Sequence, residues 1–306
     1  MSEKKKSKKK KSKTGRIIST VILIAALAVF IYAAYNLITI YTTYKAASDE
    51  YDKLSAEYTS DKTDTTPTPT PTESPDKEDE KTGDPYLDED GTLVEDDVPP
   101  LEVDFDGLKA INEDVVGWIY VDAVPEVSFP VVEGTDNDYY LHYTFDRQFN
   151  PSAAVFVSYD NARDFSDVHT VIYGHHMHDG SMFFKLDNLR DPDVVLADPY
   201  FWIMTPNGNY RYRIFAMVEV DPVGEAYTTF SGYGQEFLEW EEKMKSQSFI
   251  DFGDIPLSQY DHCVMLSTCT FDSGVRMVIL GKCVSTQRPP DPAGTVGTVE
   301  ETEENQ

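Results

Sequence analysis

The stretch that decides the fold is L-S-T-C-T-F-D-S-G-V-R, from Leu266 to Arg276. An apolar run ends at Cys269, a polar turn containing Gly274 follows, and Arg276 opens a second apolar run. Two apolar runs joined by a turn of this kind predict a pair of antiparallel strands. In such a hairpin Cys269 and Arg276 face each other at one end.

This pair of residues indicates nucleophilic chemistry. The thiolate is the reactive form of cysteine, and a neighbouring guanidinium, which is permanently charged, favours it. A proton-transfer group is available in His175, within the run Y-G-H-H-M that closes another apolar segment at 173–177. Cysteine, histidine and arginine together favour acyl transfer through a thioester. An isolated cysteine is more often a small buried residue, and the two accompanying residues decide against that alternative for Cys269.

The other two cysteines, Cys263 and Cys283, are the candidates for a disulfide in an exported domain. If Cys269 lies opposite Arg276, the register puts Cys263 opposite Lys282. Cys263 and Cys283 then point to opposite faces of the sheet. We predict that both are reduced core residues.

The sequence around these residues resembles a known family. L-S-T-C followed by Arg276 is similar to the sortase signature, and Y-G-H-H-M-H-D-G-S-M-F at 173–183 is similar to the histidine segment of class B sortases. Three further segments resemble the class B pattern: I-N-E-D-V-V-G-W-I at 111–119, F-P-V-V-E at 129–133 and the cluster Tyr139-Tyr140-Leu141. The resemblance extends over 101–284.

The resemblance implies a membrane-anchored cysteine transpeptidase that needs no cofactor. Cys269 would attack a sorting signal on an exported protein, His175 would transfer the proton, and Arg276 would position the substrate or stabilise the oxyanion. The acyl group would pass to an amine of the peptidoglycan precursor. Two alternatives stay open: a pilus-polymerising sortase whose acceptor is a pilin amine, and a non-catalytic, membrane-tethered wall-binding module. Ser267 and Thr268, just before the nucleophile, are further candidates for substrate contact.

A zinc site is the competing interpretation of the histidines at 169, 175, 176 and 178. In an extended strand His175 and His176 point to opposite faces, and neither C-x-x-C nor H-E-x-x-H accompanies them. We therefore predict no metal. The resemblance assigns the catalytic role to His175, and we expect His176 and His178 to be solvated loop residues.

The remaining pattern predicts a mostly-β domain. Short apolar or alternating runs, separated by Gly, Pro, Asn and Asp, indicate a closed or sandwiched sheet. They lie at 116–120, 127–132, 154–157, 170–173, 200–205, 210–220, 264–268 and 277–283. Helical spacing appears at 106–112 and at 235–247, where Phe237, Trp240 and Met244 share a face. The resemblance implies a closed sortase-type β-barrel with peripheral helices, including one helix before the catalytic Cys strand.

The N-terminal region is organised differently. Residues 1–16 are strongly basic, and 17–44 are uncharged and largely Ile, Leu, Val, Ala and Tyr. About 20 apolar residues suffice to span a bilayer, and Lys and Arg flank the cytoplasmic side of such a helix. We predict a cytoplasmic basic segment at 1–16 and a single-pass transmembrane helix at 17–44, with the rest outside the cell membrane. A cleaved signal peptide is the alternative, and the length of the apolar stretch disfavours it.

The segment at 45–100 begins with a short polar helix up to about Tyr58 and continues as an extracytoplasmic, acidic, Thr/Pro-rich spacer, because alternating Thr and Pro cannot build a core. The catalytic domain then occupies 101–285, and an acidic disordered tail occupies 286–306. The formal net charge of -28 is concentrated in the spacer and argues against nucleic acid as a partner.

Overall fold

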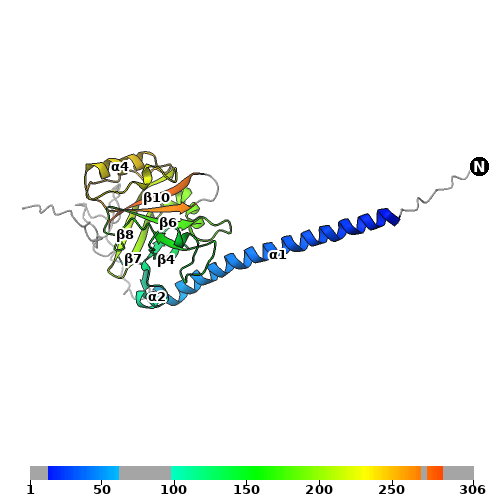
Figure 1. Cartoon of the computed structure of the whole chain (residues 1–306). Helices are drawn as coiled ribbons and strands as arrows, with labels where there is room; N and C mark the ends of the chain where they lie inside the picture. The colour runs from blue at the N-terminus through cyan, green and yellow to red at the C-terminus, as the bar shows by residue number, and fades with distance from the viewer. Residues whose placement is uncertain (1–12, 62–97, 270–273, 285–306) are drawn as a thin grey trace, which may run out of the picture. The chain divides into compact units, whose positions relative to one another are not determined.

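The computed structural model describes residues 13–61, 98–269 and 274–284, and Figure 1 labels some of its helices and strands. Contacts divide the chain into two compact units, Met1–Ala46 and Ala47–Gln306. Most of the predicted spacer and the predicted tail at 286–306 lie outside the described residues.

The first unit contains the beginning of helix α1, Lys13–Tyr58. Its large apolar side chains between Ile17 and Tyr41 are exposed. Among the described residues α1 is the one helix that is long and apolar enough to cross a membrane. The predicted N-terminal apolar helix is therefore confirmed as a helix, and its passage through a bilayer is taken up below as a proposal.

The second unit is built around a closed barrel, as predicted. Its neighbouring strands follow the order β10-β8-β7-β3-β4-β5-β6-β9. The strands are β3 Val115–Val121, β4 Ser128–Val132, β5 Val155–Val157, β6 His169–His175, β7 Tyr200–Thr205, β8 Gly208–Val220, β9 Cys263–Cys269 and β10 Arg276–Cys283. The pairs β4–β5 and β6–β9 are parallel, and the other pairs are antiparallel.

Peripheral helices and turns surround the barrel. They are α2 Phe105–Ile111, η2 Tyr139–Leu141, η3 Phe183–Arg190, α3 Pro192–Val195, η4 Glu225–Tyr227 and α4 Gln235–Ser246. Helix α4, which contacts β8, buries Phe237, Trp240 and Met244, so the predicted helix and its apolar face are confirmed. The same face also buries Glu241, a charged residue type that the apolar pattern does not predict there.

The structure differs from the predicted organisation at residues 47–61, which we assigned to the spacer. Ala47, Tyr51 and Leu54 of α1 are buried in the second unit, because their spacing of i, i+4 and i+7 puts them on one helix face. The Tyr51 hydroxyl donates to the Ala153 carbonyl oxygen at 2.6 Å. The chain then pairs β1, Thr59–Asp61, with β2, Leu101–Val103. The compact unit therefore begins at Ala47, within the segment that we assigned to the spacer.

The predicted register of the last hairpin is confirmed. Lys282 lies opposite Cys263, and Val278 lies opposite Ser267. Cys263 and Cys283 are free thiols. Cys263 is buried, as expected for a core residue, whereas Cys283 is half-buried.

Candidate active site

Strands β6 and β9 lie side by side, run parallel, and end together. The register pairs Gly174 with Thr268 and His175 with Cys269, so the predicted base and the predicted nucleophile are the last residues of adjacent strands. Side chains at paired positions of neighbouring strands lie on the same face of a sheet. The side chain of Cys269 lies outside the described residues, and its backbone position fixes this pairing.

Arg276 comes to the same end of the barrel from the other side. It opens β10, which runs antiparallel to β9. Continuing the ladder by two residues from the pair Val278 and Ser267 places Arg276 opposite Cys269. The Arg276 charge also lowers the pKa of His175, which requires the two side chains to be close. The structure therefore brings the three predicted residues together.

The ring of His175 is fixed by a backbone carbonyl. Its Nε2 atom lies 2.9 Å from the Leu141 oxygen. Because a carbonyl oxygen only accepts, Nε2 is the nitrogen that carries the hydrogen. Burial lowers the pKa of His175, the bond to Leu141 opposes that effect, and the charges of His142 and Arg276 add to it. The neutral imidazole is therefore favoured at neutral pH.

The backbone on either side of His175 is closely packed. A Cβ atom at Gly174 would lie 2.5 Å from the Phe183 ring, so only glycine allows this approach. Our expectation that His176 is a solvated loop residue is wrong. His176 is half-buried and its Nε2 lies 2.6 Å from the Asp187 carboxylate, because η3 folds back against the end of β6. His178 is exposed, as expected.

Ser267 and Thr268 are both buried. The Ser267 hydroxyl lies 2.8 Å from the hydroxyl of Tyr227 in η4. The Thr268 hydroxyl donates to the Met277 carbonyl oxygen at 3.1 Å. Both hydroxyls therefore have partners within the protein, and their contact with a substrate stays a prediction.

Comparisons with known proteins show the family of this chain. A model of the sortase domain matches residues 119–284. Sortase B from Listeria monocytogenes is 35% identical over 182 residues, which cover 58% of this chain and 73% of that protein. The chain belongs to the class B sortases.

Two further similarities support the assignment of this sortase. Sortase B from Staphylococcus aureus is 25% identical over 183 residues, covering 59% of this chain and 74% of that protein. The solved structure of sortase B from Listeria monocytogenes has a TM-score of 0.52 at 34% identity, and the match covers 58% of this chain and 99% of that one. The protein is thus a cysteine transpeptidase for cell-surface proteins, and the predicted fold and enzyme class are confirmed.

The sequence did not reveal two groups of this site. Leu141 contributes a backbone carbonyl, which every residue possesses, so no side-chain pattern could indicate it. Tyr227 lies in a single 3-10 turn between β8 and α4, where no periodicity exists. Its ring stacks on Tyr173, with 6.2 Å between the centroids.

The histidines of the sequence do not form a metal-binding cluster within the described residues. Within them, no group of three or more His, Cys, Asp or Glu side chains is placed to hold a metal ion. His169, at the other end of β6, is buried, and its Nδ1 lies 2.9 Å from the Thr228 carbonyl oxygen. The four clustered histidines of the sequence are therefore separated by the fold into different environments.

Proposed function

We propose that this sortase is held in the cell membrane by α1 and joins exported proteins to a cell-wall amine through a thioester on Cys269. The observation that carries this proposal is the register of His175 with Cys269, with Arg276 acting on His175 from β10. Membership of the class B sortases supports it independently.

The first half-reaction forms the thioester. The Cys269 thiolate attacks the carbonyl carbon of a threonine in the sorting signal, and the oxygen becomes an oxyanion. Arg276 presents a planar set of N–H donors that suits this charge. The C–N bond then breaks, and protonated His175 gives its proton to the departing amine.

The second half-reaction transfers the acyl group. An amine of the peptidoglycan precursor attacks the thioester carbon, neutral His175 takes the proton of that amine, and the C–S bond breaks. Cys269 is again a thiolate and His175 is again protonated, so atoms and protons balance over one cycle. The runner-up, a pilin amine as acceptor, uses the same steps.

The lowered pKa of His175 has a consequence for the rate. The reactive state contains a thiolate and a protonated imidazole, and ordinary thiol and imidazole pKa values of about 8.5 and 6.5 already make that combination a minority. Burial and the Arg276 charge favour the neutral ring further. We therefore propose slow turnover, in which only a small share of the molecules is reactive at any moment.

The proposed topology places the N-terminus in the cytoplasm and the barrel outside. The basic residues at 1–16 and the uncharged stretch of α1 at 17–44 support this orientation. Protease added to intact cells stripped of their wall should cut the chain between about residues 62 and 100, so that a denaturing gel shows a fragment that begins in this range. A catalytic unit that stays protected in such cells would reverse the orientation.

The function is tested by incubating the full-length protein in detergent with labelled LPxTG-like and NPxTN-like peptides and an added amine. Mass spectrometry should show a covalent acyl adduct on Cys269 and a peptide–amine product. Peptidoglycan cross-bridge amines and a pilin lysine peptide, supplied in competition, separate wall anchoring from pilus polymerisation. Absence of any adduct with all peptides would favour the non-catalytic wall-binding alternative.

A further inference from the structure

The Leu141 carbonyl that holds His175 lies in a long connection, residues 133–154, between β4 and β5. Its regular structure is the single turn η2, Tyr139–Leu141. A carbonyl on such a connection orients a ring only if the connection itself is fixed. The residue next to Leu141 provides that fixation, because Tyr140 is fully buried.

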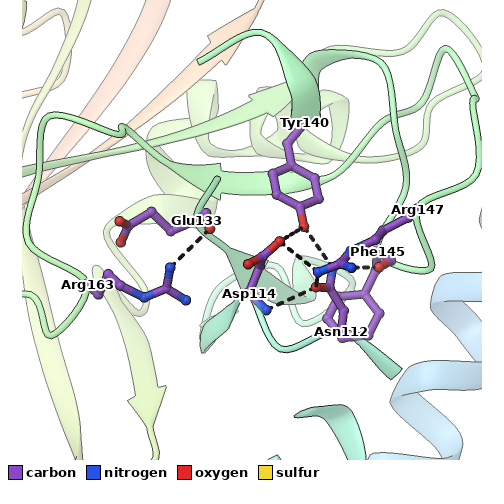
Figure 2. A network of polar contacts seen from close by, with 7 residues as sticks. All are labelled: Asn112, Asp114, Glu133, Tyr140, Phe145, Arg147 and Arg163. Carbon is purple, nitrogen blue, oxygen red and sulfur yellow. Dashed lines mark hydrogen bonds and ion pairs between the residues drawn. The ribbon is translucent and has the colours of Figure 1, made fainter. Parts of the chain in front are cut away.

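The hydroxyl of Tyr140 ties the connection to the barrel wall (Figure 2). It donates to the Asp114 carboxylate at 2.7 Å and accepts from the Asn112 side-chain amide at 2.9 Å. Asn112 and Asp114 stand where α2 ends and β3 begins. The backbone oxygen of Tyr140 also accepts from the Ala154 amide, just before β5, at 3.2 Å.

Asn112 and Asp114 also hold the connection at a second point. The Asn112 amide donates to the Phe145 carbonyl oxygen at 2.8 Å. Arg147 donates to the Asn112 side-chain oxygen at 2.8 Å and to the Asp114 carboxylate at 2.9 Å. We call Asn112, Asp114, Tyr140, Phe145 and Arg147 the tyrosine clamp; Figure 2 shows them converging.

One residue of the connection has an unusual backbone conformation. Arg147 has a φ of 63°, a left-handed conformation that residues with a Cβ rarely adopt. Such a conformation persists when surrounding contacts determine it. The two bonds of the guanidinium to Asn112 and Asp114 supply contacts of that kind.

Resting on the proposed function, we infer that Tyr140 and Asp114 are positioning residues of the transpeptidase: they fix the Leu141 carbonyl, which orients the His175 ring. The clamp thereby fixes the tautomer, because Nε2 keeps the hydrogen it donates to Leu141. Nδ1 is then the nitrogen that exchanges a proton with the substrate amine. The orienting task that a buried carboxylate performs in other catalytic triads is divided here between a backbone carbonyl and its clamp.

The test compares Tyr140→Phe with Tyr233→Phe in the full-length protein in detergent. Tyr140→Phe keeps the ring and removes the clamp hydroxyl. Tyr233→Phe removes a hydroxyl that bonds to His262, before the opposite end of β9, and so controls for lost stability. We expect kcat to fall roughly tenfold to a hundredfold in Tyr140→Phe, with KM within about twofold, and to be unchanged in Tyr233→Phe.

Asp114 allows rescue by a conservative change. Asp114→Asn keeps an oxygen that can accept from Tyr140, and we expect it to retain most of the activity. Asp114→Ala should match Tyr140→Phe, and the double variant should be little worse than either, because both changes break one unit. Equal losses from Asp114→Asn and Asp114→Ala would overturn the role of the acceptor oxygen.

A readout without substrate separates this inference from the proposed function. In protein labelled with ¹⁵N-histidine, NMR should show His175 with its hydrogen on Nε2, and a mixture of tautomers in Tyr140→Phe. An unchanged tautomer in Tyr140→Phe overturns the inference even if the sortase is active. A changed tautomer supports it even if no peptide is accepted, and that second result would count against the proposed function alone.

Discussion

Strands β6 and β9 carry two histidine–cysteine pairs, one at each end. His169 is in register with Cys263, and His175 is in register with Cys269. In both pairs a ring nitrogen of the histidine lies 2.9 Å from a backbone carbonyl oxygen. The two ends of this strand pair thus present the same residue types in the same backbone register.

We call His169 and Cys263 the inner pair, and His175 and Cys269 the outer pair. The surroundings of the inner pair make it unreactive. The His169 ring packs on Trp240, with 4.4 Å between the ring centroids, and burial lowers its pKa to about 4. Burial raises the pKa of the Cys263 thiol well above its usual range, and the neighbouring acidic groups of Glu241 and Asp261 raise it further. Both groups are therefore neutral at physiological pH.

The outer pair differs in two respects. His175 is half-buried rather than enclosed, and its charged neighbour is the cation Arg276, whereas acidic side chains neighbour Cys263. A cation beside a thiol favours the thiolate, whereas carboxylates oppose it. The comparison teaches that a cysteine paired with a histidine is not sufficient for a reactive site. The pair must also be accessible to solvent, and the adjacent charge must be positive.

The largest effect on turnover should come from replacing one of the two cysteines, and each is replaced by alanine in turn. Cys269→Ala should abolish thioester formation, lowering turnover by roughly a thousandfold or more, with the fold intact. Cys263→Ala should keep the activity within about twofold and cost about 1 kcal/mol of stability. Mass spectrometry of the acyl adduct and thermal unfolding measure both. An active Cys269→Ala protein would remove the distinction between the two ends.

The two histidines should separate in the same way, with a smaller effect. His175→Gln removes the proton carrier, and we expect a loss of about 10²- to 10⁴-fold in kcat/KM with little change in Tm. His169→Gln should leave kcat nearly unchanged and lower Tm, because it disturbs a buried ring and its bond to Thr228. A large fall in kcat for a folded His169→Gln protein would contradict this comparison.

The charge of Arg276 can be tested through the pKa of His175. Since the cation lowers that pKa, Arg276→Gln should raise it, while the pKa of His169 stays near 4. NMR titration in a Cys269→Ala background follows both rings without interference from the thiol. Arg276→Lys should keep His175 close to its original pKa and still impair turnover, because an ammonium cannot reproduce the planar donor geometry. Full activity of Arg276→Lys would reduce the role of Arg276 to its charge.

The last prediction concerns the effect of Glu241 on stability near the inner pair. Burial raises the pKa of Glu241 to about 9, from 4.5, and both its carboxylate oxygens lack a hydrogen-bond partner within the described part of the chain. Between these pH values the folded protein binds a proton that the unfolded chain releases, so stability falls as pH rises through this range. Glu241→Gln should therefore be more stable than the parent at pH 8, by roughly a few kcal/mol, and similar to it near pH 5. Parallel curves of Tm against pH for the two proteins would show that Glu241 is not protonated in the fold.

Local patterns in the sequence were sufficient for most elements of the barrel. Alternating and apolar runs predicted each of its strands, and the spacing of Phe237, Trp240 and Met244 predicted α4, because period and burial are properties of the nearest neighbours along the chain. The hairpin register followed from Cys269 and Arg276, since strands joined by a short turn have their pairing fixed by that turn. The resemblance to class B sortases then supplied the closure of the barrel and the role that we propose for His175.

Tertiary structure alone decided the contacts between distant segments. The Leu141 carbonyl meets His175 across 34 positions, Tyr140 meets Asn112 across 28, and Tyr51 meets Ala153 across 102. A hydrogen bond of this kind depends on how two distant segments of the chain are placed in the fold. No periodic pattern in the sequence indicates it. The sequence by itself predicted which residues would do the chemistry, and that Cys269 and Arg276 would meet at one end of a hairpin. The fold decided which of two similar histidine–cysteine pairs is enclosed and which stands beside a cation, because burial and charge at a site are set by segments far away in the chain.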